Sequence, residues 1–205
     1  MARIERIGEG ATVLRGFAIE DAARLFDAVC AIAAVAPFRR MVTPGGFEMS
    51  VQMTNCGALG WITDRKGYRY ERRDPETGEN WPPMPAVFLE LGKRASAEAG
   101  FAGFFPDSCL INRYEAGTLL SLHQDRNERD FGAPIVSFSL GLAAVFLFGG
   151  AERSHRPRRI PLESGDVVIW GGASRLAFHG VAPLSASVHP LTGDCRINLT
   201  LRKAL

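Results

Sequence analysis

The sequence has no closely spaced cysteines. Its four cysteines stand at positions 30, 56, 109 and 195, with no C-x-x-C motif and no near pair. Such spacing fits neither the disulfide framework of a small secreted domain nor a zinc–thiolate site. We therefore expect free thiols and a reducing, cytoplasmic location.

Long hydrophobic runs are also missing. The longest, residues 28–38, has only eleven residues, which is too few to cross a bilayer. The first seven residues, MARIERI, lack the basic region and the following apolar region of a secretory leader. We expect no signal peptide and no membrane span.

A strong excess of one charge is missing as well. Lys and Arg number 24 and Asp and Glu 22, which gives a net charge of +2. This balance excludes only a global, non-specific attraction to polyanions. Residues 61–73 carry five basic and two acidic side chains, and residues 153–159 carry four arginines and no acid. We expect these two segments to form a basic strip on a mildly acidic body.

The composition suits one folded domain, because 205 residues with 46% hydrophobic side chains can bury a sizeable core. Apolar residues at helical spacing predict a helix over 19–36, ended by Pro37, and a second over 84–99, closed by Gly100. The stretch between them is rich in glycine and aromatic residues. It predicts short hairpins and loops.

From about residue 108 the chain becomes a series of short β-like runs separated by turn residues. These runs are CLINRY, PIVSFSL, AVFLFGG, RIPLE, DVVIWGG, RLAFHGV and CRINLTLR. Seven or eight short strands in about 100 residues predict a sandwich or barrel. FGGA at 148–151 and WGGA at 170–173 do not recur at a fixed period, so we interpret them as turns at strand ends.

Two of the four histidines stand where they could bind a metal ion. His123 and Asp125 are two apart, and in extended backbone such residues point to the same face. His179, at the end of the run RLAFHG, is the third candidate. Two imidazoles and one carboxylate form the facial triad of non-haem Fe(II) oxygenases, although a zinc hydrolase would use similar ligands. We interpret His155 as a solvated loop residue and His189 as a turn cap.

The last β-like run, residues 195–202, has one apolar and one polar face. The polar face carries Arg196, Asn198, Thr200 and Arg202. An ordinary edge strand with a wet face would look the same. Two arginines at the ends of such a face could instead converge on a small dianion, for which a dicarboxylate is the obvious guest.

The run 110–114 supplies a second polar pair on one face, Asn112 and Tyr114. A core strand rarely buries an amide without a partner, because an unpaired buried amide is costly. Candidate metal ligands, two arginines and two further hydrogen-bonding residues therefore coexist within about 90 residues.

Taken together, these motifs resemble the AlkB family of Fe(II)- and 2-oxoglutarate-dependent dioxygenases, which remove alkyl groups from nucleobases. The resemblance rests on N-R-Y at 112–114, H-x-D at 123–125, S-L-G-L at 139–142, G-D-V-V-I-W-G-G at 165–172, H-G at 179–180 and C-R-x-N-x-T-x-R at 195–202. Upstream, M-T-N-C-G at 53–57, G-W at 60–61 and G-Y-R-Y at 67–70 are similar to the nucleotide-recognition segment of the bacterial members. The resemblance covers most of the chain from about residue 40.

The resemblance implies a mainly β fold with flanking helices (α+β), built on a double-stranded β-helix, or jelly roll. The β-helix core is expected over 105–205. Residues 1–104 are expected to form an N-terminal extension with buttressing helices and a nucleotide-recognition lid at about 40–81. The family leans to monomers, so one compact monomeric unit is expected.

For the reaction, the resemblance implies the iron ligands His123, Asp125 and His179. It also implies a set of residues that hold 2-oxoglutarate: Asn112, Tyr114, Arg196, Asn198 and Arg202. The implied activity consumes O₂, decarboxylates 2-oxoglutarate to succinate and CO₂, and hydroxylates the alkyl carbon of a damaged base such as 1-methyladenine or 3-methylcytosine. Release of the aldehyde then restores the base, which is direct-reversal DNA repair.

For the substrate, the resemblance implies that Trp61 and Tyr68 line the base pocket and that Arg153 contacts the nucleic acid. Core packing of a small hairpin is the alternative for the two aromatics. Tyr70 belongs to the same recognition segment, and Arg69 replaces an apolar residue there, which adds a phosphate contact. Asn127 stands where the bacterial members usually have Asp, so the base preference stays open.

Three functions are therefore compatible with the sequence. The first is a nucleic-acid dealkylase acting on single- or double-stranded DNA, with RNA as an alternative substrate. The second is an Fe(II)/2-oxoglutarate hydroxylase of a small molecule or a protein, and the third is a non-enzymatic binder, which the fold would permit. The paired arginines argue against the third, and Trp61, Tyr68 and the basic segments favour the first.

Overall fold

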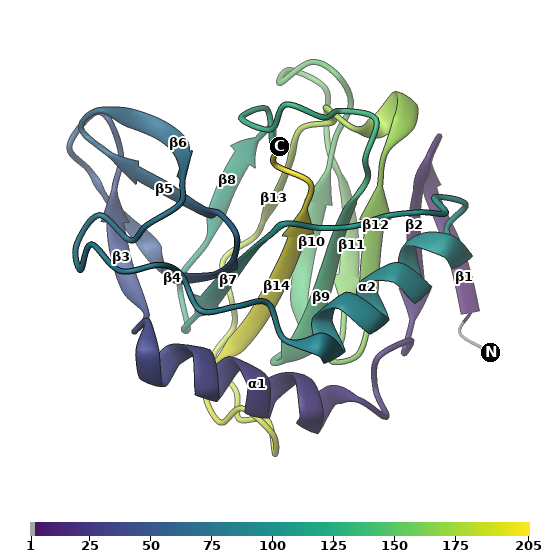
Figure 1. The fold of residues 1–205 in the computed structure, drawn as a ribbon. Coiled ribbons are helices and arrows are strands. Elements are labelled where there is room, and N and C mark those ends of the chain that lie inside the picture. Colours follow the sequence, from purple (N-terminus) through teal and green to yellow (C-terminus); the bar gives the residue numbers. More distant parts are fainter. Residues whose placement is uncertain (1–2) are drawn as a thin grey trace.

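The computed structural model describes residues 3–205, which fold into antiparallel sheets with two flanking α-helices (Figure 1). The N-terminal half contains β1 (Arg3–Gly8), β2 (Ala11–Arg15), α1 (Ala22–Val35), β3 (Arg39–Val42), β4 (Glu48–Gly57), β5 (Gly60–Asp64), β6 (Gly67–Glu71) and α2 (Ala86–Glu98). The C-terminal half contains β7 (Ser108–Tyr114), β8 (Leu120–His123), β9 (Ile135–Gly141), β10 (Ala144–Phe148), β11 (Arg158–Leu162), β12 (Val167–Trp170), a short 3₁₀ helix (Gly172–Ser174), β13 (His179–Val181) and β14 (Arg196–Arg202).

Two sheets face each other. The larger has eight strands in the order β1-β2-β12-β9-β14-β7-β4-β3, and the smaller has four in the order β11-β10-β13-β8. Apolar side chains fill the space between them, Met53, Ile135, Phe146 and Trp170 among them. This arrangement confirms the predicted mainly β, jelly-roll class.

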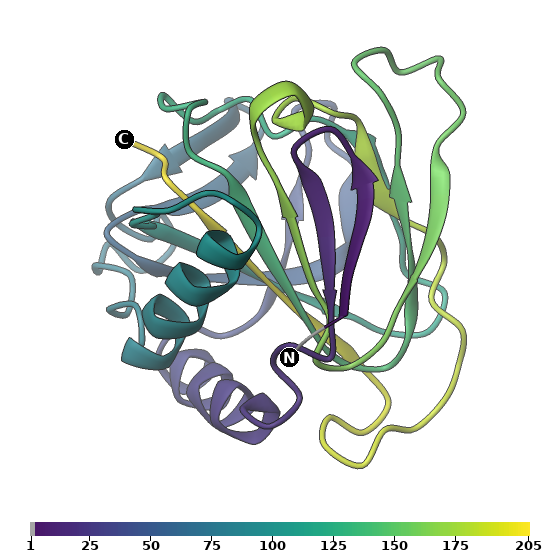
Figure 2. The ribbon, with the colours of Figure 1, turned by 90° about the vertical axis from the view of Figure 1, so that its right-hand side faces the viewer.

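The outer face of the large sheet is covered by both helices, which lie on the same side of it (Figures 1 and 2). Leu25 of α1 and Phe88 of α2 belong to one buried cluster with Phe138 and Leu199 of the sheet. Apolar residues at helical spacing place these side chains on one stripe of each helix. The predicted helices at 19–36 and 84–99 are therefore confirmed, with bounds two or three residues shorter at their starts and one residue shorter at their ends.

The N-terminal residues 3–15 contribute a hairpin that the sequence analysis did not predict. β1 pairs with β2, and β2 pairs with β12 at the edge of the core sheet. β1 is mostly exposed, so it carries little hydrophobic alternation to reveal it. In addition, β4 pairs with β7. The large sheet therefore runs without a break across the expected boundary at residue 104.

The expected lid region is built from β3, β4 and the separate two-stranded sheet of β5 and β6, which stands to one side of the core (Figure 1). Trp81 fixes this hairpin, because its indole nitrogen donates to the Glu71 carbonyl at 3.0 Å. A Cβ on Gly60 would lie 2.3 Å from the Trp81 ring, so only glycine allows this close approach. The predicted short hairpins are confirmed for this segment.

The described part of the chain contains no helix that is long and apolar enough to cross a membrane.

Candidate active site

The two candidate histidines lie side by side on neighbouring strands of the small sheet. His123 ends β8, His179 begins β13, and the two are directly paired, with ring centroids 4.3 Å apart. Gly180 makes this pairing possible, because a Cβ there would lie 2.5 Å from the Leu120 carbonyl oxygen. Close backbone approach at a glycine thus brings the two imidazoles together.

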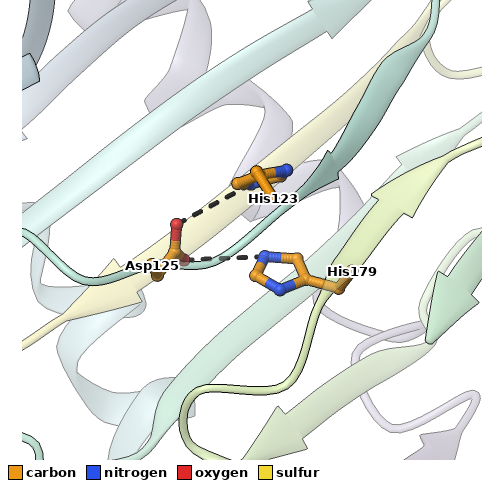
Figure 3. A group of neighbouring side chains, drawn as sticks. All are labelled: His123, Asp125 and His179. Atoms are coloured by element: carbon orange, nitrogen blue, oxygen red, sulfur yellow. Dashed lines mark ion pairs between the residues drawn. The ribbon is translucent and has the colours of Figure 1, made fainter. Parts of the chain in front are cut away.

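Backbone carbonyls orient both imidazoles. The Nδ1 atom of His123 lies 2.9 Å from the Ser121 carbonyl oxygen, and that of His179 lies 3.0 Å from the Ala177 oxygen. Each ring therefore donates through Nδ1–H and directs its Nε2 lone pair toward Asp125, at 3.7 Å and 3.8 Å from the two carboxylate oxygens (Figure 3). The donor atoms of the three residues all lie within 4.8 Å of one another. Two imidazole nitrogens and one carboxylate oxygen suit Fe(II).

The electrostatics hold Asp125 and His179 in their metal-binding forms. Burial favours the neutral acid of Asp125, but the Arg202 guanidinium, 2.7 Å away, outweighs it and keeps the pKa of Asp125 well below its usual range. Burial, reinforced by His123, lowers the pKa of His179 to about 3. At neutral pH the site therefore offers a carboxylate and a neutral imidazole.

The local backbone differs from the prediction at both ends of this triad. β8 stops at His123, so Asp125 follows the strand and does not lie within an extended H-x-D run. The run RLAF before His179 forms a turn, and His179 begins a strand where we predicted that it would end one. Arg175 lies at the start of this turn, and its buried guanidinium donates to the Asp125 carbonyl at 2.8 Å and to the Ala133 carbonyl at 3.1 Å.

The other two histidines behave as predicted. His155 is exposed on the loop after β10, where its Nε2 lies 3.5 Å from Glu152. His189 accepts a hydrogen bond from the Leu191 amide at 3.1 Å, inside a turn. Neither belongs to the group that could hold a metal ion.

The polar face of β14 forms the floor beside the triad. Arg196, Asn198, Thr200 and Arg202 line the cavity, while Ile197, Leu199 and Leu201 pack against the helices. The predicted two-faced strand is confirmed, although the strand lies in the middle of the large sheet and has no wet edge. Asn198 is fully engaged, because its amide donates to Ser137 Oγ at 2.7 Å and to the Phe138 carbonyl at 2.9 Å.

The two arginines of this face differ in their partners. Arg202 binds Asp125 and lies 3.7 Å from Glu128. Arg196 is 1% exposed and donates through Nη2 to Ser139 Oγ at 3.0 Å, but its Nε and Nη1 have no partner in the described part of the chain. Burial lowers the pKa of Arg196. A buried guanidinium with two free donors fits the carboxylate of an anionic ligand.

A cavity of about 510 Å³ opens above this floor and reaches the lid. Its lid wall is an aromatic pair, because the Trp61 and Tyr68 rings stack at 22° with centroids 5.7 Å apart. Both rings line the cavity; Tyr68 is 47% exposed, and Trp61 is partly buried against the core between the two sheets. The structure brings twelve of the predicted site residues into the lining of this one cavity: Trp61, Tyr68, Asn112, Tyr114, His123, Asp125, Asn127, Arg153, His179, Arg196, Asn198 and Arg202.

Two residues predicted to contact the substrate, Arg69 and Tyr70, lie outside the cavity lining. Arg69 sits on the other face of the β5–β6 hairpin from Tyr68, because successive strand residues alternate. There its guanidinium binds Asp64 at 2.8 Å and 2.9 Å and Glu71 at 2.7 Å. All three of its guanidinium nitrogens therefore have carboxylate partners on this face.

Tyr70 joins the lid to the core. Its hydroxyl donates to Glu128 Oε1 at 2.5 Å, and burial raises the pKa of Tyr70, so the hydroxyl keeps its proton. The Glu128 carboxylate is itself buried, 3.3 Å from Arg175. Neither Glu128 nor Arg175 is marked as a buried residue by its local sequence. Glu128 sits in the charged run RNERD, typical of a surface loop, and Arg175 looked like the start of a strand.

Removal of the Tyr70 hydroxyl should loosen the lid. In Tyr70→Phe, Glu128 loses a donor in a buried position, so the free energy of unfolding should fall by about 2 kcal/mol. Amide hydrogen exchange should accelerate across residues 60–71. Chemical denaturation and exchange mass spectrometry measure both effects. The control is Tyr68→Phe at the exposed end of the same hairpin, and equal stability of the two variants would contradict a Tyr70 anchor.

Comparisons with known proteins agree with this geometry. The family model of the 2OG-Fe(II) oxygenase superfamily matches residues 10–202. Alpha-ketoglutarate-dependent dioxygenase AlkB of Salmonella typhimurium is 56% identical over 200 residues, which cover 98% of this chain and 93% of that protein. The chain belongs to the AlkB family. Nucleic acid dioxygenase ALKBH1 of Mus musculus is 33% identical over 138 residues, which cover 67% of this chain and 34% of that protein.

The fold of this AlkB family member is also found among solved structures. OsALKBH1 matches with a TM-score of 0.86 and 30% identity, over 98% of this chain and all of that chain. The cofactor of the superfamily is Fe(II), and its co-substrate is 2-oxoglutarate. Both fit the residues present here, since the His-Asp-His triad provides the iron ligands and Arg196 provides free donors to a carboxylate.

Proposed function

We propose that this chain removes alkyl groups from damaged nucleobases by oxidation, coupled to the decarboxylation of 2-oxoglutarate to succinate and CO₂. One observation carries the proposal: the iron triad, the free guanidinium of Arg196 and the stacked Trp61–Tyr68 wall line a single cavity. Bound Fe(II) and 2-oxoglutarate supply the oxidising power, with O₂ as the oxidant. The chain supplies coordination, orientation and a partly enclosed pocket.

Polar residues of β14 and β7 hold the co-substrate, directly or through a neighbour. Arg196 binds one carboxylate of 2-oxoglutarate, with Tyr114 packed below it, where the guanidinium carbon lies 5.0 Å from the ring centroid. Asn112 supports this position through its hydrogen bond to Asn198 at 3.2 Å. Arg202 acts through Asp125, because its guanidinium donates to that carboxylate at 3.0 Å and holds it in position.

The lid, residues 40–81, receives the base. The aromatic faces of Trp61 and Tyr68 stack on a nucleobase and favour one with a positive ring charge, such as 1-methyladenine or 3-methylcytosine. A base in duplex DNA must leave the helix to reach the cavity, and a lesion that blocks pairing lowers that cost. Arg153, which lines the cavity, and the other arginines of 153–159 attract the phosphate backbone of the nucleic acid by their positive charge.

The chain is proposed to work as one monomeric unit in the cytoplasm, with residues 105–205 as the catalytic core and 1–104 as its extension. All four cysteines are free thiols, and Cys56, Cys109 and Cys195 are buried. Free thiols are typical of a reducing compartment.

The decisive experiment is a repair assay. Purified protein with Fe(II), ascorbate and 2-oxoglutarate should convert 1-methyladenine and 3-methylcytosine in single-stranded DNA to the parent bases, with release of formaldehyde and succinate. Mass spectrometry of the oligonucleotide follows the loss of the methyl group. Succinate formation without any base repair would overturn the proposal in favour of a hydroxylase of small molecules or proteins.

A further inference from the structure

A loop without regular structure, residues 149–157, joins β10 to β11 and carries Arg153 to the cavity. Its first two residues are tied to the residue before a metal ligand. The Gly149 amide donates to the Phe178 carbonyl at 2.7 Å, and the Phe178 amide donates to the Gly150 carbonyl at 2.9 Å. Phe178 therefore has a fixed backbone position at the base of this loop.

The Phe178 ring extends this link from the backbone to Arg153. Both side chains line the cavity, and the Arg153 guanidinium carbon lies 5.9 Å from the centroid of the half-buried ring. A cation at this distance over an aromatic face is attracted by the ring quadrupole. Arg153 itself is exposed on the loop, and an arginine without support samples many rotamers. The ring contact favours the rotamers that bring the guanidinium to the cavity.

A ring leaves the donors of a guanidinium free, whereas a carboxylate occupies them. Arg69 shows the second case, since carboxylates bind all three of its guanidinium nitrogens. In the described part of the chain a single carboxylate lines the cavity, that of Asp125, and Arg202 already binds it. The N–H groups of a guanidinium that rests on a ring stay available for paired hydrogen bonds to an anion. A phosphate of the nucleic-acid backbone is such an anion.

We propose that Phe178 is a positioning residue, which holds the Arg153 guanidinium at the cavity with its N–H donors free to bind a phosphate of the substrate strand. The inference rests on the proposed dealkylase function. It gives Phe178 a part in strand binding, separate from the metal ligand His179 that follows it in the chain. Because Phe178 acts through Arg153, replacement of the ring should weaken strand binding and leave the chemical step unchanged.

The test measures binding of a single strand without turnover. Protein loaded with Zn(II), which does no redox chemistry, and with 2-oxoglutarate is titrated with a labelled oligonucleotide that carries 1-methyladenine. Fluorescence anisotropy at several salt concentrations gives the affinity and its salt dependence. Phe178→Leu should weaken binding by about two- to fivefold, the value of an exposed cation–π contact. The slope of log affinity against log salt should become shallower, because one bound phosphate contributes about 0.7 to it on a single strand.

Three further variants separate this role from general support of the fold. Phe178→Tyr keeps the aromatic face and should bind like the wild type, and a loss equal to that of Phe178→Leu would overturn the inference. In an Arg153→Met background, Phe178→Leu should have no further effect, because the two residues act together. Phe17→Leu is the matched control. It removes the ring under Arg94, whose guanidinium carbon lies 5.4 Å from the centroid, outside the cavity lining, so strand affinity should not change.

The repair assay with Fe(II) separates the two failures. A wild type that neither binds nor repairs the methylated strand overturns the proposed function. Repair by the wild type, with equal strand affinity of the wild type and Phe178→Leu, overturns this inference alone. The inference also fails if Phe178→Leu keeps its affinity loss in the Arg153→Met background, or if it loses iron or kcat at unchanged KM, because the ring would then support His179.

Discussion

The His123→Ala variant is expected to lose its iron and its dealkylation activity together. Three donors from His123, Asp125 and His179 surround the site, so removal of one leaves two. Loss of even an outer-shell partner of a metal ligand costs about 10- to 100-fold in affinity or activity, and loss of a ligand should exceed about 100-fold. His123 is the best member to replace, because its side chain is one-third exposed and leaves the core packing intact.

Metal analysis of the purified variant and the repair assay measure the two losses. His155→Ala is the matched control, since His155 is exposed on a loop and its imidazole pairs only with Glu152 at 3.5 Å in the described structure. That variant should retain full iron content and activity. Full activity of His123→Ala would remove His123 from the ligand set.

Much of the site could be predicted because successive side chains of a β-strand point to opposite faces. In β14 the alternation of residues 196–202 is preserved because the strand is regular and both of its faces are buried, one against helices and one against the cavity. The same rule placed Asn112 and Tyr114 together on β7. Period-two alternation depends only on local backbone geometry, so it can be read without knowledge of the fold.

Contacts between distant segments were not predictable in this way. Arg175 and Glu128 meet at 3.3 Å although 47 positions separate them, and nothing in either local run marks them as buried partners. Arg69 was assigned a phosphate contact, but the register of β5 and β6 gives it Asp64 and Glu71 as neighbours. The β1–β2 hairpin was missed because β1 is mostly exposed and β2 is held in the sheet by its pairing with the distant strand β12. Such features depend on tertiary partners and not on local propensity.

The Arg196→Met variant is expected to bind 2-oxoglutarate far more weakly and, without ligand, to be more stable than the wild type. The Arg196 guanidinium is buried with two unpartnered nitrogens, and replacement of a buried charge by an apolar side chain of similar volume often stabilises by about 1–4 kcal/mol. The same donors should bind the co-substrate carboxylate. Their loss, as for a broken buried ion pair, should cost about 3–5 kcal/mol of affinity, or more than 100-fold.

Thermal denaturation with and without 2-oxoglutarate separates these two effects. Ligand at 100 times its dissociation constant should stabilise the wild type by about 2.7 kcal/mol, and this shift should vanish in Arg196→Met. The control is Arg113→Met, on the opposite face of β7, whose partly exposed guanidinium lies 3.6 Å from Glu115. It should keep the full shift. A purely structural Arg196 would give the reverse pattern, a less stable protein that still responds to the ligand. If Arg196→Met is more stable without ligand and is no longer stabilised by 2-oxoglutarate, the buried Arg196 guanidinium is an anion-binding group.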